Sequence, residues 1–550
     1  MSAGGTGDRY REVYAAFRWQ VPAQFNIAHH CCARWACERH RLALCWEDES
    51  GEIRTYTYRD LQEAANRASH MLAALGIARG DRVALILPQR PETAIAYLAC
   101  FQMGAIAVPL SFLFGPEALE YRLADSGAKV AIVDPDTLPN LKAVWERVPN
   151  VEWAIGVAGA RAGGVVDWDA TLAEAPPSFE PAATRASDPA AIIYTSGTTG
   201  PPKGALLPHS VLIGNLPGFE HSHDGFPRAG DLFWSPADWA WTGGLWDALM
   251  PTLYHGQAIL GYRGRFEAER AFRLLEKYSI RNAFLFPTAL KMMMKTVPEP
   301  RKRFDLKLRS LMSGGEPVGP ALFHWCRDQL GVTVNEIFGQ TEMNYIVGNS
   351  HTLWPVKPGS MGRPYPGHRI AVIDDAGREL GPGEVGDIAV HREWHGTPNP
   401  VFFLGYWGND AATANKYTGD WCRTGDQARW DEDGYLWYQG RADDMFKSAG
   451  YRIGPAEIEN CLVKHAAVAN CAVIPIPDET RGAVIKAFIL LAPGFAPSPA
   501  LEQSIRDHVK AALAPYQQPR EIEFVDALPM TTTGKVQRKV LRERESSHKP

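Results

Sequence analysis

The sequence lacks several features that would place the protein in a special class. None of its apolar runs is long enough to cross a bilayer, and its first residues, MSAGGTGDRYREVY, show no basic segment followed by an apolar one. Charge of neither sign is in large excess, because 57 lysines and arginines stand against 62 aspartates and glutamates. The resulting net charge of -5 gives no reason to expect a nucleic-acid or membrane-surface partner. We therefore expect a cytoplasmic protein without stable membrane insertion.

Cysteine is also too scattered for a disulfide framework. The nine cysteines are an odd number, which is typical of reduced thiols. One short window, HHCCARWACERH, has the composition of a zinc site, but such sites commonly take paired, closely spaced ligands from two segments. The helical spacing of Cys32, Trp35 and Ala36 instead favours a helix with buried thiols. The window contains His29, His30, Cys31, Cys32, Cys37 and His40.

What the sequence does contain is a regular alternation of helical and strand-like runs over 550 residues, a length that suggests more than one domain. In the first half, YRDLQEAANRASHMLAAL is followed by RVALILP and then by PETAIAYLACFQMGA. Strict alternation predicts βαβ units and a mostly parallel sheet. From about residue 359, short strands between Gly, Pro and Asp turns follow. We predict an α/β fold with doubly wound subdomains and a small β-rich subdomain in residues 1–440, and a small α+β domain in residues 441–550.

The most informative segment is AIIYTSGTTGPPKG, at residues 191–204. An apolar strand runs into Ser, Thr and Gly, whose hydroxyl and N–H groups are good anion ligands, and Lys203 adds positive charge. The common nucleotide pattern GxxxxGK[ST] does not fit, because Pro202 precedes the lysine and Gly204 follows it. A Gly-rich surface turn would not explain the hydroxyl residues beside a lysine. The segment therefore predicts a phosphate loop.

YTSGTTGPPKG resembles the phosphate-loop signature of the adenylate-forming enzymes, which include acyl-CoA synthetases, aryl-CoA ligases, luciferases and peptide-synthetase adenylation domains. Further segments resemble motifs of that family in the same order and extend the likeness over most of the chain. They are MSGGEP, FGQTEM, CRTGD, GRADDMFKSAGYRIGPAEIE and PMTTTGKVQRK. GYRIGPAEIE and GQTE look most like the medium-chain acyl-CoA synthetase branch.

The resemblance implies ATP, Mg2+ and coenzyme A as the small-molecule partners. Glu342 would help to hold the metal, Asp426 would bind the ribose hydroxyls, and Lys535 would be the catalytic lysine. Asp443 would be the hinge, and Thr195 a further catalytic residue. The residues that the resemblance assigns to nucleotide and coenzyme A binding are Ser196, Gly197, Thr198, Thr199, Gly200, Lys203, Gly315, Glu316, Pro317, Gln340, Thr341, Asp426, Arg441, Gly450 and Arg452.

The chemistry that the resemblance implies joins a carboxylate to the α-phosphate of ATP and expels pyrophosphate. Two anions must meet, so cations and N–H donors aimed at the developing charge are the main catalytic tool. By itself Lys535 could be a solvated lysine of the basic tail, but the ordered motifs before it favour the catalytic role. The resemblance also implies that the C-terminal domain then rotates, so that Lys535 leaves and SAGYRIG forms a channel for coenzyme A.

The acid pocket is expected to contain small residues. Acetate-specific relatives place a tryptophan where Gly339 stands, and losing an indole would open room for methylenes worth about 0.8 kcal/mol each. This predicts a medium-chain or short branched fatty acid. The other expected pocket residues are Trp241, Thr242, Gly243 and Gly314.

Other substrates and roles stay open at this stage. An aromatic plug would leave acetate or propionate, and aryl acids, as alternatives; the candidates for it are Phe233, Trp239, Trp241 and Trp246. An amino acid is less favoured, because no acid stands at Thr242 or Gly243 to hold an ammonium group. A non-catalytic adenylate-binding protein is less favoured because the catalytic set is retained. A homo-oligomer is compatible with the sequence.

Overall fold

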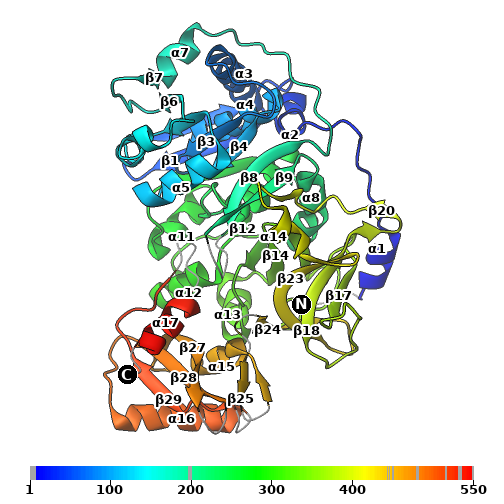
Figure 1. Cartoon of the computed structure of the whole chain (residues 1–550), viewed down its shortest axis with the longest axis vertical. Coiled ribbons are helices and arrows are strands. Elements are labelled where there is room, and N and C mark those ends of the chain that lie inside the picture. The colour runs from blue at the N-terminus through cyan, green and yellow to red at the C-terminus, as the bar shows by residue number, and fades with distance from the viewer. Residues whose placement is uncertain are drawn as a thin grey trace.

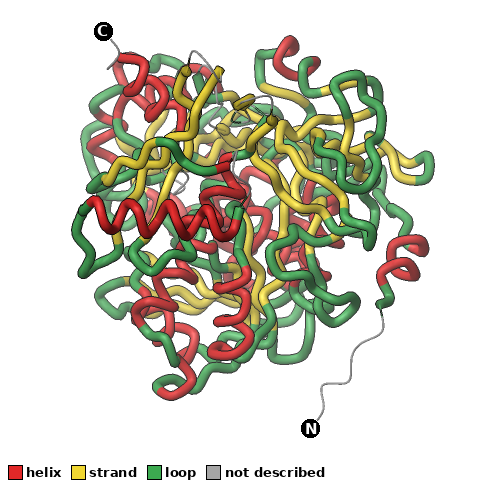
Figure 2. Tube along the Cα trace, turned by 90° about the horizontal axis from the view of Figure 1, so that it is seen from below, coloured by secondary structure: helices red, strands yellow, loops and turns green. Residues whose placement is uncertain are grey.

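The computed structural model describes residues 8–195, 201–442, 444, 446–448, 451–478, 482–513, 517–530 and 536–547. Figure 1 shows the N-terminal two thirds of the chain as a layered body and the last helices and strands, in orange and red, gathered at one end. Figure 2 shows strands running through the interior with helices packed around them. Within the described ranges, no helix combines the length and apolar composition that crossing a membrane requires.

The first sheet has eight strands in the order β21-β9-β8-β4-β3-β5-β6-β7, parallel from β8 to β7. It follows from the βαβ alternation that the sequence predicts. Its strands are β3 (Arg82–Ile86), β4 (Ile106–Pro109), β5 (Val130–Val133), β6 (Trp153–Gly156), β7 (Val165–Asp167), β8 (Pro189–Thr195), β9 (Lys203–Pro208) and β21 (Gly405–Tyr406), and its helices α3 (Tyr58–Ala74), α4 (Pro91–Met103), α5 (Pro116–Ser126), α6 (Leu138–Lys142) and α7 (Trp168–Glu174).

A second sheet has nine strands in the order β16-β15-β14-β13-β12-β10-β11-β1-β2. Its central strands β11, β10, β12, β13 and β14 are parallel. The strands are β1 (Leu42–Asp48), β2 (Ile53–Thr57), β10 (Leu232–Trp234), β11 (Ala258–Arg263), β12 (Asn282–Phe284), β13 (Ser310–Gly314), β14 (Val334–Gln340), β15 (Met343–Gly348) and β16 (Arg363–Pro364), and the helices α8 (Val211–Ser222), α9 (Thr242–Gly244), α10 (Met250–Tyr254), α11 (Ala268–Lys277), α12 (Pro287–Thr296) and α13 (Pro320–Trp325).

The main apolar core lies between these two sheets. Val83 and Leu85 of β3 belong to it together with Phe284 of β12, whereas Ala84 and Ile86 face a separate cluster on the other side of the first sheet. Alternate residues of one strand therefore bury both faces of the sheet. This is the doubly wound arrangement that the sequence predicts.

A five-stranded antiparallel sheet forms the β-rich subdomain, and a smaller α+β unit ends the chain. The first contains β17 (Ile370–Ile373), β18 (Gly386–His391), β22 (Tyr417–Thr418), β23 (Trp421–Trp430) and β24 (Leu436–Arg441). The second contains β25 (Phe446–Ser448), β26 (Tyr451–Ile453), α15 (Pro455–Leu462), β27 (Val468–Asp478), β28 (Gly482–Leu491), α16 (Pro499–Ala512), β29 (Glu521–Phe524) and α17 (Arg538–Ser547). The domain limits 1–440 and 441–550 stay a prediction.

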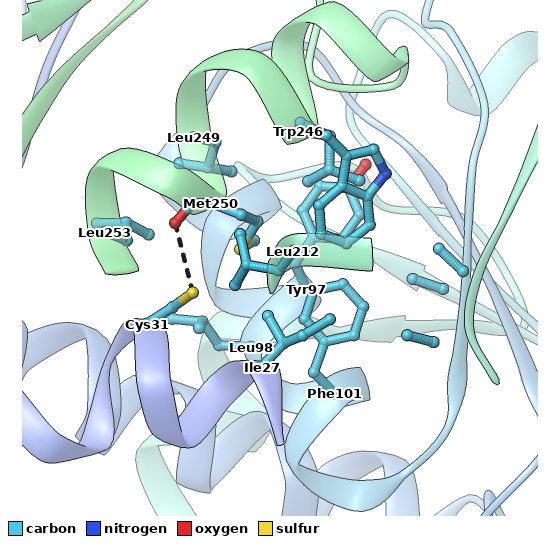
Figure 3. Packing of buried hydrophobic residues seen from close by; sticks show 14 of the residues in the cluster. Ile27, Cys31, Tyr97, Leu98, Phe101, Leu212, Trp246, Leu249, Met250 and Leu253 are labelled. Atoms are coloured by element: carbon cyan, nitrogen blue, oxygen red, sulfur yellow. Dashed lines mark hydrogen bonds between the residues drawn. The ribbon is translucent and has the colours of Figure 1, made fainter. Parts of the chain in front are cut away.

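The cysteine-rich window folds into the core. Helix α2 (Ile27–Cys31) is shorter than its sequence suggests, because the backbone breaks at Cys32 before a 3-10 turn, Ala33–Trp35. The thiol of Cys31 lies 3.4 Å from the carbonyl oxygen of Met250, among the apolar side chains that Figure 3 shows. Burial raises the pKa of both Cys31 and Cys32. The expectation of buried thiols is confirmed, although Cys37 is exposed. The remaining short elements are α1 (Tyr10–Ala16), α14 (Asp410–Ala414), β19 (Glu393–Trp394) and β20 (Thr397–Pro398).

Candidate active site

Asp426 lies at the centre of a polar cluster where the β-rich subdomain meets the end of β14. It faces Arg441 across the antiparallel β23–β24 pair, and Arg441 Nη1 lies 3.2 Å from Asp426 Oδ2. Gln340 Nε2 donates to the same oxygen at 2.5 Å and to the carbonyl of Thr424 at 2.8 Å. The hydroxyl of Tyr438 donates to Asp426 Oδ1 at 3.3 Å. The fold thus brings together residues from three of the predicted motifs.

Glu342 connects this cluster to the predicted phosphate loop. Its carboxylate is buried and accepts a hydrogen bond from the hydroxyl of Tyr406. The Nζ of Lys203 lies 5.3 Å from the centre of the same tyrosine ring. Tyr406 reaches this position because β21 pairs with β9, which places Tyr406 opposite Ala205. Burial and the neighbouring Glu342 raise the pKa of Tyr406 above its usual range.

The Glu342 carboxylate fits the role of a magnesium ligand. Magnesium prefers oxygen ligands and is commonly bound through one or two carboxylates together with substrate phosphates. In the part of the chain that the structure describes, the Tyr406 hydroxyl donates to Oε1 of this carboxylate, and a magnesium ion would take its protein ligand from the same group. Lys203, whose Nζ lies over the Tyr406 ring, would add positive charge for phosphate oxygens.

Threonine hydroxyls make three contacts with residues of the predicted motifs, one of which joins the expected acid pocket to a nucleotide motif. The hydroxyls of Thr242 and Thr341 lie 2.9 Å apart, across segments that are far apart in the sequence. The hydroxyl of Thr288, at the start of α12, donates to both carboxylate oxygens of Glu316, at 3.0 and 2.8 Å. Thr195 Oγ1 donates to the Lys203 carbonyl at 3.4 Å, where β8 ends and β9 begins. The first two contacts join segments that follow strands of the second sheet, and the third lies within the first sheet.

Three glycines of the expected acid pocket face different neighbours. A Cβ added to Gly243 would lie 3.0 Å from Phe284 Cε1 and 3.7 Å from Phe286 Cε1. At Gly314 a Cβ would meet the side chain and the carbonyl of Ile337 at 2.9 Å. Both positions favour glycine, because aromatic side chains lie against Gly243 and an aliphatic side chain lies against Gly314.

Gly339 requires a correction. A Cβ there would lie 2.6 Å from the backbone nitrogen of Tyr345 and 2.8 Å from Asn344 Oδ1, on the neighbouring strand β15. The pairing of β14 with β15 is irregular between Phe338 and Gln340, which brings the two strands together at this point. Atoms of β15 therefore occupy the space along the Cβ direction that we expected from the missing indole, whereas the place of Gly339 in the acid pocket stays a prediction.

The candidates for an aromatic plug differ in burial, and their role stays a prediction. Phe233, Trp239 and Trp246 are completely buried in the core. Trp241 is partly buried and packs edge to face on Phe114, with ring centres 5.8 Å apart. The aromatic side chains that stand against the pocket glycines are instead Phe284 and Phe286.

Several residues of the site could not be identified from the sequence, because they do not belong to any of the motifs. Tyr406 and Tyr438 arrive by strand pairing, and Lys416 contacts Gln340 through Nζ and Oε1 at 3.2 Å. Phe284 and Phe286 carry the one available signal. Phe284 ends a buried strand and Phe286 follows two residues later, at the carboxyl edge of a parallel sheet where ligands commonly bind.

Two buried carboxyl groups near the pocket were also not expected. Asp247 is paired with the Asn344 amide, and burial raises the pKa of Asp247 to about 8. Asp238 accepts from the Ser111 hydroxyl at 2.8 Å, and burial raises its pKa to about 6. At pH 7 Asp247 is therefore mostly protonated, whereas Asp238 is still mostly ionised.

Several expected residues lie outside the described part of the chain. These are Ser196, Gly197, Thr198, Thr199, Gly200, Asp443, Gly450 and Lys535, together with the side chain of Arg452. Gly315 is described and has a φ of +87°, a conformation that favours glycine. Pro317 follows Glu316 before α13.

Comparison with known proteins gives a consistent result. The family model described as AMP-binding enzyme matches residues 32–407, and that of the AMP-binding enzyme C-terminal domain matches residues 457–535. An uncharacterised acyl-CoA ligase of Bacillus subtilis is 36% identical over 96% of this chain and 98% of its own length. Acetyl-coenzyme A synthetase of the same organism is 33% identical over 97% and 94%. The crystal structure of an anthranilate CoA ligase with anthranoyl-AMP is 30% identical, covers 96% of this chain and 98% of its own, and has a TM-score of 0.87.

Proposed function

From the premise that the chain belongs to the AMP-binding enzyme family, we propose that it activates a medium-chain or short branched carboxylic acid with ATP and transfers the acyl group to coenzyme A. It is then an AMP-forming acyl-CoA ligase, with ATP, Mg2+ and coenzyme A as the reactants and cofactor. The observation that supports this most is the contact between Gln340, Asp426 and Arg441 at the junction of two sheets.

In the first half-reaction, the residues of the site orient ATP and balance its charge. Gln340 and Arg441 hold the Asp426 carboxylate in place, and a carboxylate can accept from both ribose hydroxyls. When bound, Mg2+ on Glu342 would reduce the charge repulsion of the phosphates. The carboxylate oxygen of the substrate attacks the α-phosphorus, the bond to the β-phosphate oxygen breaks, and pyrophosphate leaves with the electron pair.

In the second half-reaction, the thiol sulfur of coenzyme A attacks the acyl carbon of the mixed anhydride, AMP leaves, and the thiol proton is lost. We place the change between the two steps at Asp443, about which the domain of residues 441–550 would rotate relative to residues 1–440. Lys535 would serve the first step, and Gly450 and Arg452 the second. Hinges commonly lie at a few residues that absorb a change in φ and ψ.

The choice of acid rests on the resemblance to acyl-CoA synthetases, with Thr242, Gly243 and Gly314 as the expected pocket residues. Phe284 lies against the Cβ position of Gly243 and Ile337 against that of Gly314. A specific observation supports an aryl acid as the second candidate. The rings of Phe284 and Phe286 both lie against Gly243, and aromatic rings attract each other edge to face. Acetate or propionate remains the alternative among aliphatic acids. A cytoplasmic location and a homo-oligomer are part of the same proposal.

The proposal is tested by pyrophosphate release from the purified full chain with ATP and Mg2+. The acids are acetate, isobutyrate, hexanoate, octanoate and benzoate, each with and without coenzyme A. We expect release with isobutyrate or hexanoate that exceeds release with acetate, and an acyl-CoA product only with coenzyme A. Asp426→Ala is the matched inactive variant. Absence of release with every acid would exclude the ligase, and strongest release with acetate or benzoate would transfer the proposal to the corresponding alternative.

A further inference from the structure

We infer that Phe286 is the wall of the acid pocket that limits the length of the acyl chain, so that a short branched acid is preferred to a medium-chain acid. This inference rests on the proposed function. Phe286 lies outside the motifs found in the sequence. Its role is inferred only from the residues that surround it in the structure.

Phe286 stands at the carboxyl end of strand β12. It directly precedes Pro287 and caps helix α12, with φ -60° and ψ 151°. In a parallel sheet this edge is where ligands commonly bind, and the proline after it restricts the backbone. The position of the ring is therefore set by a strand on one side and a helix on the other.

One edge of the Phe286 ring faces two segments of the site. Its Cε1 lies 3.7 Å from the Cβ position of Gly243, and the adjacent Cδ1 lies 3.9 Å from the Cβ position of Gly315. Gly243 follows Thr242, which contacts Thr341, whereas Gly315 belongs to the segment MSGGEP, which the resemblance assigns to nucleotide binding. The ring edge thus stands between the acid side and the nucleotide side of the site.

The ring of Phe284 packs against the ring of Phe286. The two ring centres are 4.8 Å apart at an angle of 67°, an edge-to-face contact. Phe284 is 2% exposed and belongs to the main core, whereas Phe286 is only partly buried. Part of the Phe286 ring is therefore accessible. Phe284 cannot move away from it, because the core around Phe284 is tightly packed.

An acyl chain that extends past Gly243 meets the supported ring edge. Each further methylene along the chain would have to displace the ring, whereas a branch close to the carboxyl group would not reach it. Misfit of one methylene in a pocket commonly changes relative rates by about 10- to 200-fold. Phe286 is therefore the specificity-determining residue for chain length.

The test compares Phe286→Ala with a matched control, Phe304→Ala. Phe304 is also partly buried and stacked on a phenylalanine, Phe272, with ring centres 5.3 Å apart, but it lies outside the site. The kcat/KM for isobutyrate, hexanoate and octanoate and the KM for ATP are measured by pyrophosphate release. We expect the octanoate-to-isobutyrate ratio to rise about tenfold or more in Phe286→Ala and to stay within about twofold of the wild type in Phe304→Ala.

Three outcomes would overturn the inference while leaving the ligase intact. The first is an unchanged ratio in an active Phe286→Ala enzyme. The second is an equal loss for all acids with a raised KM for ATP, which would place the ring against the nucleotide. The third is a wild type that already prefers octanoate. If Phe286→Ala fails to fold, Phe286→Leu should give a smaller rise of the same ratio, and an unchanged ratio there would contradict the inference equally. A wild type without activity on any acid would instead refute the proposed function.

Discussion

At the residue scale, the contacts of the polar residues of the site were easier to predict from the sequence than the surroundings of its glycines. Gln340, Asp426 and Arg441 are identified by motifs and lie in contact. Their function requires charged or hydrogen-bonding atoms, which residue type alone reveals. The sequence gives no reason to distinguish Gly243 from Gly339 as pocket residues. In the structure Gly243 faces phenylalanine rings, whereas Gly339 faces strand β15. The space around a glycine depends on its neighbours, which the motif does not contain.

Gly339 gives a direct prediction. Because its Cβ position lies 2.6 Å from the Tyr345 nitrogen, Gly339→Ala should lower the free energy of unfolding by about 1–3 kcal/mol, as overpacking commonly does. Gly339→Trp should therefore lose stability without gaining activity on acetate. Denaturant unfolding and pyrophosphate release measure the two effects. Gly163→Ala is the control, since nothing lies within 4 Å of its Cβ position. A stable Gly339→Trp enzyme with acetate activity would contradict the geometry.

Asp247 predicts a pH dependence of stability. Its pKa is raised by burial from 3.8 to about 8, so between these values the folded state carries a proton that the unfolded state has lost. The free energy of unfolding should therefore fall as the pH rises, by up to about 1.4 kcal/mol per pH unit from this group. Asp247→Asn removes this contribution, and its stability relative to the wild type should improve steadily from pH 5 to pH 8.

Urea unfolding at pH 5, 6, 7 and 8 tests this prediction. Asp410→Asn, at an exposed carboxylate, is the control and should follow the wild type at every pH. Parallel curves for Asp247→Asn and the wild type would show that Asp247 titrates alike in the folded and unfolded states.

At the element scale, long periodic segments were predicted well. The helix expected from YRDLQEAANRASHMLAAL is α3, and a capping box between Thr57 and Asp60 fixes its start. The strand RVALILP is β3. The cysteine-rich window was less predictable, because its helix stops at Cys32 where tertiary packing of both thiols competes with helix propensity.

Helix α17 shows how one element fixes the segment after the predicted hinge. Arg538 lies 3.2 Å from Asp444 and 2.5 Å from Glu459 of α15, and Arg542 lies 2.7 Å from the second oxygen of Asp444. Glu459 also accepts from the backbone of Val473 in β27 at 2.8 Å. Two helices, a strand and the chain next to Asp443 are thereby joined through carboxylates.

Arg538→Ala should lower the stability of this unit by about 1.5–3 kcal/mol, since it removes hydrogen bonds to charged groups that are largely shielded from water. Hydrogen exchange of the β27 amides in the full chain measures the loss. Lys539→Ala provides the control, because its pair with Glu543 is exposed and worth about 0.5 kcal/mol or less. Equal protection of β27 in both variants would mean that the Asp444 and Glu459 contacts contribute little.

At the scale of the whole molecule, residues 441–550 would contribute different groups to the two half-reactions that take place on residues 1–440. If Lys535 acts only in the first step, Lys535→Ala should slow pyrophosphate release by about 100-fold or more, because it removes the charge aimed at the α-phosphate. The same variant should still convert supplied acyl-adenylate and coenzyme A to acyl-CoA at close to the normal rate. Lys539→Ala should leave both rates unchanged. Equal loss of both half-reactions in Lys535→Ala would contradict the division of labour.

The sequence by itself determined the α/β alternation, the family and the reaction class, because each rests on contiguous residues whose spacing is visible along the chain. Only the tertiary structure decided the shape of the acid pocket. Phe286 stands against Gly243, and Tyr406 joins Glu342, through segments that are distant in sequence. Strand pairing and close packing determine which side chains fill a space, and these contacts have no period or motif from which they could be predicted.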